Sequence, residues 1–144
     1  MEQEQLEITY QLDDGGFEPT KAHDTDAGFD IRTPEFLIVK AHNSVFVDTK
    51  VRVFIPKGYV GMLKSKSGLN VKKGIVSEGV IDADYTGTIG VKLYNHSDSD
   101  VCFDVGDKIT QLVFLPIPDV VMMPGIVIGK EIARGDNGFG STGR

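Results

Sequence analysis

The apolar residues of this chain recur at the interval expected of β-strands, and this spacing limits the folds that the chain can adopt. Residues 6–10 and 89–93 alternate between apolar and polar side chains, which is typical of half-buried strands. No segment keeps the i, i+3, i+4 apolar spacing of an amphipathic helix over three turns. About ten short segments, of which 126–128 is the last, are separated by turn residues. The pattern predicts an all-β sandwich or jelly-roll-like β-barrel.

Length and charge limit the classes of function. With 144 residues, the chain is long enough for one domain with a substantial core. The formal net charge of −6 argues against nucleic acid as the main partner, because duplex binding needs a basic surface. The polar N-terminal residues and the lack of a long apolar run indicate neither a signal peptide nor a membrane span. We therefore expect a soluble cytoplasmic protein that binds neither nucleic acid nor membrane.

The single cysteine, Cys102, rules out an intramolecular disulfide and a metal cluster built from thiolates. Its neighbours Val101 and Phe103 are apolar, so we expect a buried thiol in a reducing compartment. The three histidines are widely separated in the sequence, and no dedicated metal site is expected from them.

A candidate ligand site lies between the apolar segments 75–81 and 89–93. Asp82, Asp84 and Tyr85 stand between them. The pattern predicts a β-hairpin whose tip presents two acids and an aromatic ring. Considered alone, an ordinary acidic turn is the more frequent explanation, because Asp and Gly dominate turns for conformational reasons. Other segments of the chain must decide between the two.

Two further segments carry charged or hydroxyl groups. Asp30 stands between Phe29 and Ile31, and considered alone it is best explained as a solvated strand residue. Residues 64–69 interleave lysine and serine, and Ser67 could cap a short helix that runs to residue 73. The start of such a helix offers backbone N–H groups and cations to an anion, although an exposed turn has a similar sequence.

The final residues, 131–144, are rich in glycine and contain Gly138-x-Gly140-x-x-Gly143. This spacing matches a dinucleotide fingerprint, but no βαβ unit precedes it, so we reject that interpretation. A disordered Gly/Ser tail is the simplest alternative. Arg134, Phe139 and Arg144 favour instead an arm that becomes ordered on binding a nucleotide.

Taken together and in order, five segments resemble the trimeric dUTPase family, the deoxyuridine triphosphate nucleotidohydrolases. They are 27–31 (Ala-Gly-Phe-Asp-Ile), 65–69 (Ser-Lys-Ser-Gly-Leu), 79–87 (Gly-Val-Ile-Asp-Ala-Asp-Tyr-Thr-Gly), 106–112 (Gly-Asp-Lys-Ile-Thr-Gln-Leu) and 134–143. The third and fifth segments are the most specific. The resemblance implies a jelly-roll subunit with at most one short helix, assembled as a threefold homotrimer. Residues 1–130 would form the barrel domain, and 131–144 a flexible arm that closes over a neighbouring subunit's active site.

The resemblance also implies a reaction in which dUTP and water give dUMP and pyrophosphate with Mg²⁺, limiting uracil in DNA and supplying dUMP for thymidylate synthesis. Asp82 would be the general base for the water that attacks the α-phosphorus, and Gln111 would lie near that water. Asp30 would support the site, through the waters of the metal or through a bound partner. The metal would have no direct protein ligand and would be held by phosphates and water.

Each of three sites would draw the first, second and fourth segments from one subunit, the hairpin from a second and the arm from a third. The backbone of the hairpin would recognise uracil, Tyr85 would pack under the deoxyribose, and Phe139 would stack on the base. Arg134 and residues 140–142 would hold the outer phosphates. The implied substrate-binding set is Ser65, Lys66, Ser67, Gly68, Gly79, Val80, Ile81, Tyr85, Arg134, Phe139, Gly140, Ser141 and Thr142.

Three positions depart from the family pattern. Lys66 stands where arginine is usual, Thr88 where an acidic residue or asparagine is common, and Asn137 where glycine is common. Two alternatives remain open. A dCTP deaminase-like enzyme shares the fold, although it would need a different hairpin sequence. A nucleotide-switched interaction protein on the same fold would use the ordering of the arm as its signal.

Overall fold

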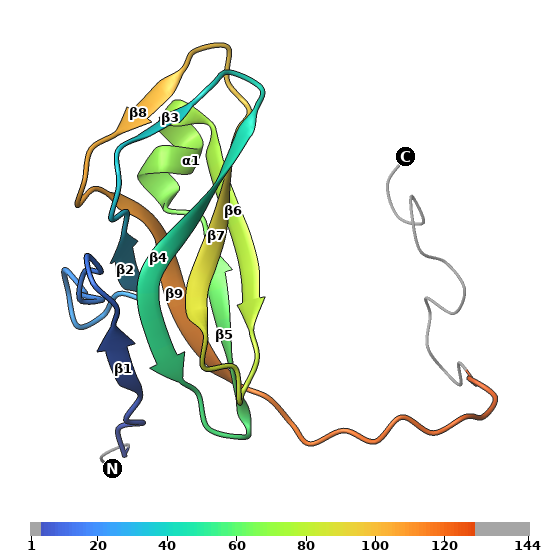
Figure 1. The fold of residues 1–144 in the computed structure, drawn as a ribbon. Helices are drawn as coiled ribbons and strands as arrows, with labels where there is room; N and C mark the ends of the chain where they lie inside the picture. The colour runs from blue at the N-terminus through green and yellow to red at the C-terminus, as the bar shows by residue number, and fades with distance from the viewer. Residues whose placement is uncertain (1–3, 129–144) are drawn as a thin grey trace.

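The protein is an antiparallel β-structure with one short helix, in a computed structural model that describes residues 4–128 (Figure 1). The all-β fold class and the single short helix predicted from the sequence are thereby confirmed. The elements are β1 (Thr9–Leu12), β2 (Phe29–Arg32), β3 (Leu37–Val39), β4 (Ser44–Phe54), β5 (Tyr59–Lys64), α1 (Ser67–Lys73), β6 (Ile75–Ile81), β7 (Thr88–Asn95), β8 (Val101–Phe103) and β9 (Lys108–Pro116).

Seven strands form one sheet in the order β1-β4-β7-β6-β5-β9-β2, and β3 pairs with β8 beside it. Every pair in both sheets is antiparallel. The large sheet curls, so that the edge strands β1 and β2 both border one groove, which Tyr10 and Phe29 line. Figure 1 shows the resulting jelly-roll-like barrel, with α1 covering its upper end.

The core lies inside the curl, and strand alternation explains which residues enter it. In β4, Val47, Val51 and Val53 are buried while Phe46 and Phe54 point outward. Their buried neighbours on β7 are Ile89, Val91 and Leu93. Each fully buried aliphatic side chain contributes about 1.5–3 kcal/mol relative to an exposed one. This face fixes the register of the strands that carry the site, because a slip by one residue would expose it.

Two predicted strands differ from the structure. The first strand is β1, which begins at Thr9 and lies on the surface at the sheet edge, rather than spanning residues 6–10. Residues 126–128 belong to no strand among the described residues. They lie on an extended segment that leaves the barrel after Pro116 (Figure 1), where no neighbouring strand is available for pairing.

Two local predictions chose the wrong residue within a correctly predicted element. Cys102 is exposed, because β8 alternates and it is Val101 and Phe103 that face the core. Ser67 does not cap α1. It is the first helical residue, and the N-cap position belongs to Lys66, which makes no side-chain capping bond. The helix ends at Gly74, whose φ of 68° gives the left-handed geometry that glycine adopts without strain.

Candidate active site

The first part of the candidate site is built around Asp30, a buried carboxylate that two lysines hold. Asp30 is only 5% exposed. Lys66 Nζ donates to its Oδ1, and Lys108 Nζ lies 3.2 Å from its Oδ2. Burial alone would raise the pKa of Asp30, but the hydrogen bonds from the two lysines outweigh burial and lower the pKa below its ordinary value. The sequence-based interpretation of Asp30 as a solvated residue is therefore wrong.

Three strands bring these groups together. Asp30 of β2 pairs with Gln111 of β9, and Gln111 pairs on its other side with Lys64 of β5. The chain continues from Lys64 directly into Ser65 and Lys66, which places the lysine beside β2. Gln111 Nε2 then donates to Ser65 O at 3.0 Å, tying this loop to the sheet. We call Asp30, Lys66, Lys108 and Gln111 the Asp30 cluster.

Polar groups beneath the loop hold it in place. Ser65 Oγ donates to Ser77 O at 3.2 Å and accepts from Ser77 N at 3.0 Å. The buried hydroxyls of Ser77 and Thr110 are 2.8 Å apart. Ser67 and Gly68 follow at the exposed start of α1, next to the cluster. The predicted phosphate segment thus lies on one rigid support, together with Asp30 and Gln111.

Gly28 makes the close approach to Gln111 possible. A Cβ atom at this position would lie 2.8 Å from Gln111 Oε1 and 3.0 Å from a methyl group of Val113. Any side chain here would push the amide of Gln111 out of place. Lys108 lies inside the fourth family-like segment, but no role was predicted for it from the sequence.

The second part of the candidate site is the hairpin of β6 and β7, whose strands separate toward its tip. In the described structure their pairing runs from Ile75–Asn95 to Glu78–Lys92 and ends there. Beyond this point, residues 79–81 pair only with β5, and Gly90 and Val91 pair with β4. A hollow of about 390 Å³ opens between the two strands. The backbone of Gly79, Val80 and Ile81 therefore has one side free for a ligand.

The tip of the hairpin holds Tyr85 in a fixed position. Its hydroxyl donates to Thr88 O at 2.7 Å, and its ring passes so close to Gly87 that a Cβ there would lie 2.6 Å from the hydroxyl. Asp82 lies at the end of β6 and is exposed, and none of the ion pairs in the described residues involves it. Asp84 has a left-handed backbone with φ of 74°.

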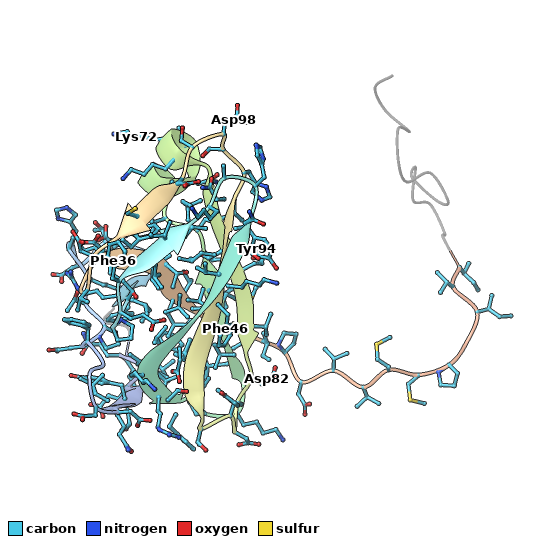
Figure 2. All side chains as sticks on the ribbon, turned by 45° about the horizontal axis from the view of Figure 1, so that its top comes forward. Phe36, Phe46, Lys72, Asp82, Tyr94 and Asp98 are labelled. Carbon is cyan, nitrogen blue, oxygen red and sulfur yellow. The ribbon has the colours of Figure 1, made fainter. Side chains whose placement is uncertain are left out.

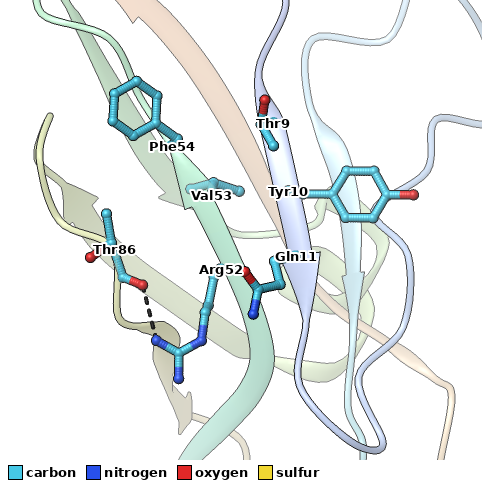
Figure 3. Close-up of a pocket in the computed structure, with 7 residues that line it drawn as sticks. All are labelled: Thr9, Tyr10, Gln11, Arg52, Val53, Phe54 and Thr86. Carbon is cyan, nitrogen blue, oxygen red and sulfur yellow. Dashed lines mark hydrogen bonds between the residues drawn. The ribbon is translucent and has the colours of Figure 1, made fainter.

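Arg52 and Asp13 brace the tip, and sequence reasoning missed both. Arg52 Nη1 donates to Thr86 O at 3.1 Å (Figure 3), while its Nε and Nη2 donate to the two carboxylate oxygens of Asp13 at 2.8 and 2.9 Å. The hydrogen bonds from Arg52 lower the pKa of Asp13. The sequence signal that could have indicated this role is the position of the arginine between the apolar residues Val51 and Val53.

The two parts of the candidate site are well separated within one chain. Asp30 is three strands from β6, across β9 and β5. Successive pairing across the sheet leads from Asp30 through β9 and β5 to Glu78 of β6. Glu78 lies four residues before Asp82 in the sequence. With about 4.8 Å between strands and 3.4 Å per residue, the two carboxylates are roughly 20 Å apart, although the curl shortens this. Within one chain, Asp30 and Asp82 therefore lie at separate places on the sheet.

Comparison with known proteins agrees with these features. The family model described as dUTPase matches residues 17–143. The chain belongs to the dUTPase family. The deoxyuridine 5'-triphosphate nucleotidohydrolase of Saccharomyces cerevisiae is 40% identical over 126 residues, which are 87% of this chain and 86% of the yeast protein.

Two solved structures of the dUTPase family extend the likeness to three dimensions. The dUTPase of Staphylococcus bacteriophage 80alpha, solved with dUPNHPP, has a TM-score of 0.87 and 29% identity, covering 96% of this chain and 99% of that one. A mutant dUTPase from phage phi11 of S. aureus has a TM-score of 0.75 and 28% identity, covering 84% and 99%. The phi11 structure is described as revealing the coordination of a structural Mg(II) ion.

Some predicted features of a dUTPase site lie beyond the described residues. Arg134, Phe139, Gly140, Ser141 and Thr142 fall in the part of the chain that the structure does not describe. Within residues 4–128, no group of three or more His, Cys, Asp or Glu side chains could hold a metal ion. No helix in the same range is long and apolar enough to cross a membrane.

Proposed function

We propose that this chain hydrolyses dUTP to dUMP and pyrophosphate, at sites shared between the subunits of a homotrimer. Membership of the dUTPase family supports the reaction. The observation that carries the shared site is the separation of Asp82 from the Asp30 cluster within one subunit. A second subunit that placed its hairpin against the cluster would bring the two parts together.

The open hairpin provides a place for the base and the sugar. A uracil ring entering between β6 and β7 meets the free backbone of residues 79–81, whose N–H and C=O groups match the donor and acceptor edge of uracil. Cytosine reverses one donor and one acceptor on that edge, so the same backbone leaves groups unpaired and rejects it. The ring of Tyr85 supports the deoxyribose and leaves no room for a 2′-hydroxyl.

The Asp30 cluster provides the phosphate site. Lys66, Ser67 and Gly68 face the phosphates with an ammonium, a hydroxyl and backbone N–H groups. Ser65 holds this loop in place through the bonds of its hydroxyl to the backbone of Ser77. Asp30 holds Lys66 and Lys108 in position, and because both of its oxygens are engaged, it acts through these lysines rather than through the waters of a metal. Gln111 lies at the same place and orients the attacking water.

Asp82 is the general base of the proposed mechanism. Asp82 is exposed and makes no ion pair within residues 4–128, so its lone pairs can accept the proton of the attacking water. The water oxygen forms a bond to the α-phosphorus, and the bond from that phosphorus to the leaving pyrophosphate breaks. A positioned general base typically contributes about 10²–10⁴-fold to the rate.

Magnesium fits this site as a partner of the substrate. The described residues offer no protein cage, and Asp30 is already neutralised by two lysines, so the ion would be held by phosphate oxygens and water. When bound, it supplies charge neutralisation on the triphosphate. The protein's own part is to position those phosphates with Lys66 and the start of α1.

The segment 117–128 supports the trimer. It leaves the barrel as an extended chain (Figure 1) and exposes large apolar side chains, with Met122 87% and Val127 98% exposed. Exposed apolar surface of this extent marks an interaction surface. We propose that this segment runs along a neighbouring subunit, that residues 131–144 continue it as the arm over the active site, and that the trimer is cytoplasmic.

The test of the reaction is pyrophosphate release from dUTP, dTTP, dCTP and UTP by the purified protein with Mg²⁺. We expect turnover of dUTP alone. Comparable turnover of UTP, or ammonia release from dCTP in place of pyrophosphate release from dUTP, would refute the proposal.

The test of the shared site is a mixing experiment with two inactive variants, Asp82→Asn and Lys66→Ala. In randomly mixed 1:1 trimers, a site with Asp82 from one subunit and Lys66 from another is intact with a probability of about one quarter. Unmixed variants should be inactive, and denatured and refolded mixtures should regain up to that fraction of wild-type activity. A mixture that stays inactive, despite mixed trimers by native mass spectrometry, would show that each subunit holds a complete site.

A further inference from the structure

Phe46 is a large exposed aromatic residue that neither the core nor the proposed catalytic groups explain. It lies on the outer face of β4 and is 67% exposed. Figure 2 shows it on this face between Tyr94 and Asp82. It lines the hollow of the hairpin together with Val80, Ile81 and Tyr85.

The ring of Phe46 lies directly over Gly90. A Cβ atom at Gly90 would collide with the ring, so the glycine makes room for it. Asp48 pairs with Gly90, and Phe46 pairs with Lys92, which fixes the ring over the part of β7 that faces the open slot. Tyr85 is placed in the same way over Gly87 at the tip of the hairpin.

We infer that Phe46 is a specificity-determining residue that limits the size of the base slot. The slot is bounded by the free backbone of residues 79–81 on one strand and by Gly90 on the other. Strand pairing fixes the position of the backbone on both sides of the slot. The width available to a base at the outer end of the slot is therefore limited by the ring of Phe46 over Gly90. The inference rests on the proposed function and adds to it a side-chain contribution to the exclusion of bases with a 5-methyl group.

The size of the effect of Phe46 on discrimination between dUTP and dTTP can be estimated from the group that the ring excludes, which is one methyl group. One methyl group more or less in an apolar pocket is worth about 10–200-fold in discrimination. Removing the ring opens the mouth of the slot but leaves the backbone recognition of uracil in place. Phe46→Ala should therefore raise the ratio of kcat/KM for dTTP to that for dUTP by about tenfold, the lower end of this range.

The experiment measures that ratio for wild type, Phe46→Ala, Phe46→Leu and Phe54→Ala. Phe54 lies on the same face of the same strand and is similarly exposed, but it lies away from the hollow, so its variant should keep the wild-type ratio. Phe46→Leu retains part of the bulk and should give an intermediate ratio. Affinities for dUMP and dTMP by calorimetry should change in the same direction, which separates base recognition from chemistry.

Gly90→Ala provides an independent test. In the wild-type background, the added methyl group displaces the ring and should raise KM for dUTP. In the Phe46→Ala background the same change should cost much less, because the clash partner is absent. A wild-type enzyme that turns over dUTP, with Phe46→Ala and Phe46→Leu both retaining its dTTP:dUTP ratio, would overturn this inference alone. A wild type without dUTP turnover would overturn the proposed function instead.

Discussion

Asp30 and Asp82 stand in the two halves of the proposed site, and the protein holds them in opposite ways. Asp30 is buried, with both oxygens occupied by ammonium groups. Asp82 is exposed at the end of β6, and no ion pair within the described residues involves it. A buried carboxylate is costly unless it is paired, whereas an exposed one needs no partner.

This difference indicates which of the two carboxylates can act as a general base. A perturbed pKa often marks a functional residue, and by that criterion Asp30 would be chosen. A general base must be accessible to the water whose proton it accepts, whereas Asp30 is buried and both of its oxygens bind ammonium groups, which disfavour its protonation. Its lowered pKa reflects a structural arrangement that orders two lysines, while the less conspicuous Asp82 keeps the freedom that the chemistry requires.

The largest expected effect comes from removing the proposed general base. Asp82→Asn should lower kcat by about 10²–10⁴-fold, because the amide cannot accept the proton of the attacking water. Affinity for dUPNHPP should remain close to that of the wild type, as should thermal stability. Asp84→Asn is the matched control, since it is also exposed at the tip and its left-handed backbone suits asparagine. Equal losses in the two variants would remove Asp82 from its proposed role.

Removing the buried partner should affect stability as well as activity. Asp30→Asn leaves Lys66 and Lys108 close together without a negative charge between them, and breaking a buried ion pair in this way costs about 3 kcal/mol. Urea denaturation at one fixed protein concentration measures the loss, because the proposed trimer would make stability depend on concentration. Asp100→Asn removes an exposed ion pair with Lys40 and should cost less than about 1 kcal/mol. Similar losses in the two variants would mean that the Asp30 cluster is not a buried network.

The same comparison predicts a dependence on pH. Since the folded-state pKa of Asp30 lies below the unfolded value of about 3.9, its contribution is present above that value and is lost as the pH falls through the folded-state pKa. The difference in free energy of unfolding between wild type and Asp30→Asn should be constant above about pH 5 and should shrink toward pH 3. Denaturation curves across this range provide the measurement, and a difference that grows on acidification would contradict the assigned direction.

The sequence predicted the strands well where one face of the sheet is buried. β7 alternates between buried and less buried positions along its whole length, as its apolar spacing indicates. Alternation alone did not predict the phase of β8, so Cys102 was placed inside when its neighbours occupy the core. Residues 126–128 have a strand-like sequence, but a strand also needs a partner, which the sequence of one segment does not contain.

The hairpin half of the candidate site could be predicted from the sequence more fully than the Asp30 cluster. The hairpin tip is contiguous in sequence, so its aspartates and Tyr85 could be recognised together. The Asp30 cluster depends on an ion pair with Lys66, which is 36 residues away in the sequence, and on the pairing of β2 with β9. The sequence around Asp30 does not indicate that this residue is buried. The roles of the individual residues remain predictions that the variants above are designed to test.

The smallest expected effect concerns the lysine that replaces a common arginine. An arginine can hold a carboxylate or a phosphate with two parallel N–H groups, whereas Lys66 offers a single ammonium. Lys66→Arg should keep the link to Asp30 and lower KM for dUTP only a few-fold, because the charge is unchanged and only the geometry of the contact improves. Lys64→Arg is the matched control: its ammonium pairs with Glu78 on the surface, 2.8 Å away, and the ion pairs of Asp30 are made by Lys66 and Lys108 instead. Steady-state kinetics on both variants distinguish the cases. A large loss of activity in Lys66→Arg would mean that the space around Asp30 is fitted to lysine, and that the buried half of the site tolerates less change than its charge alone requires.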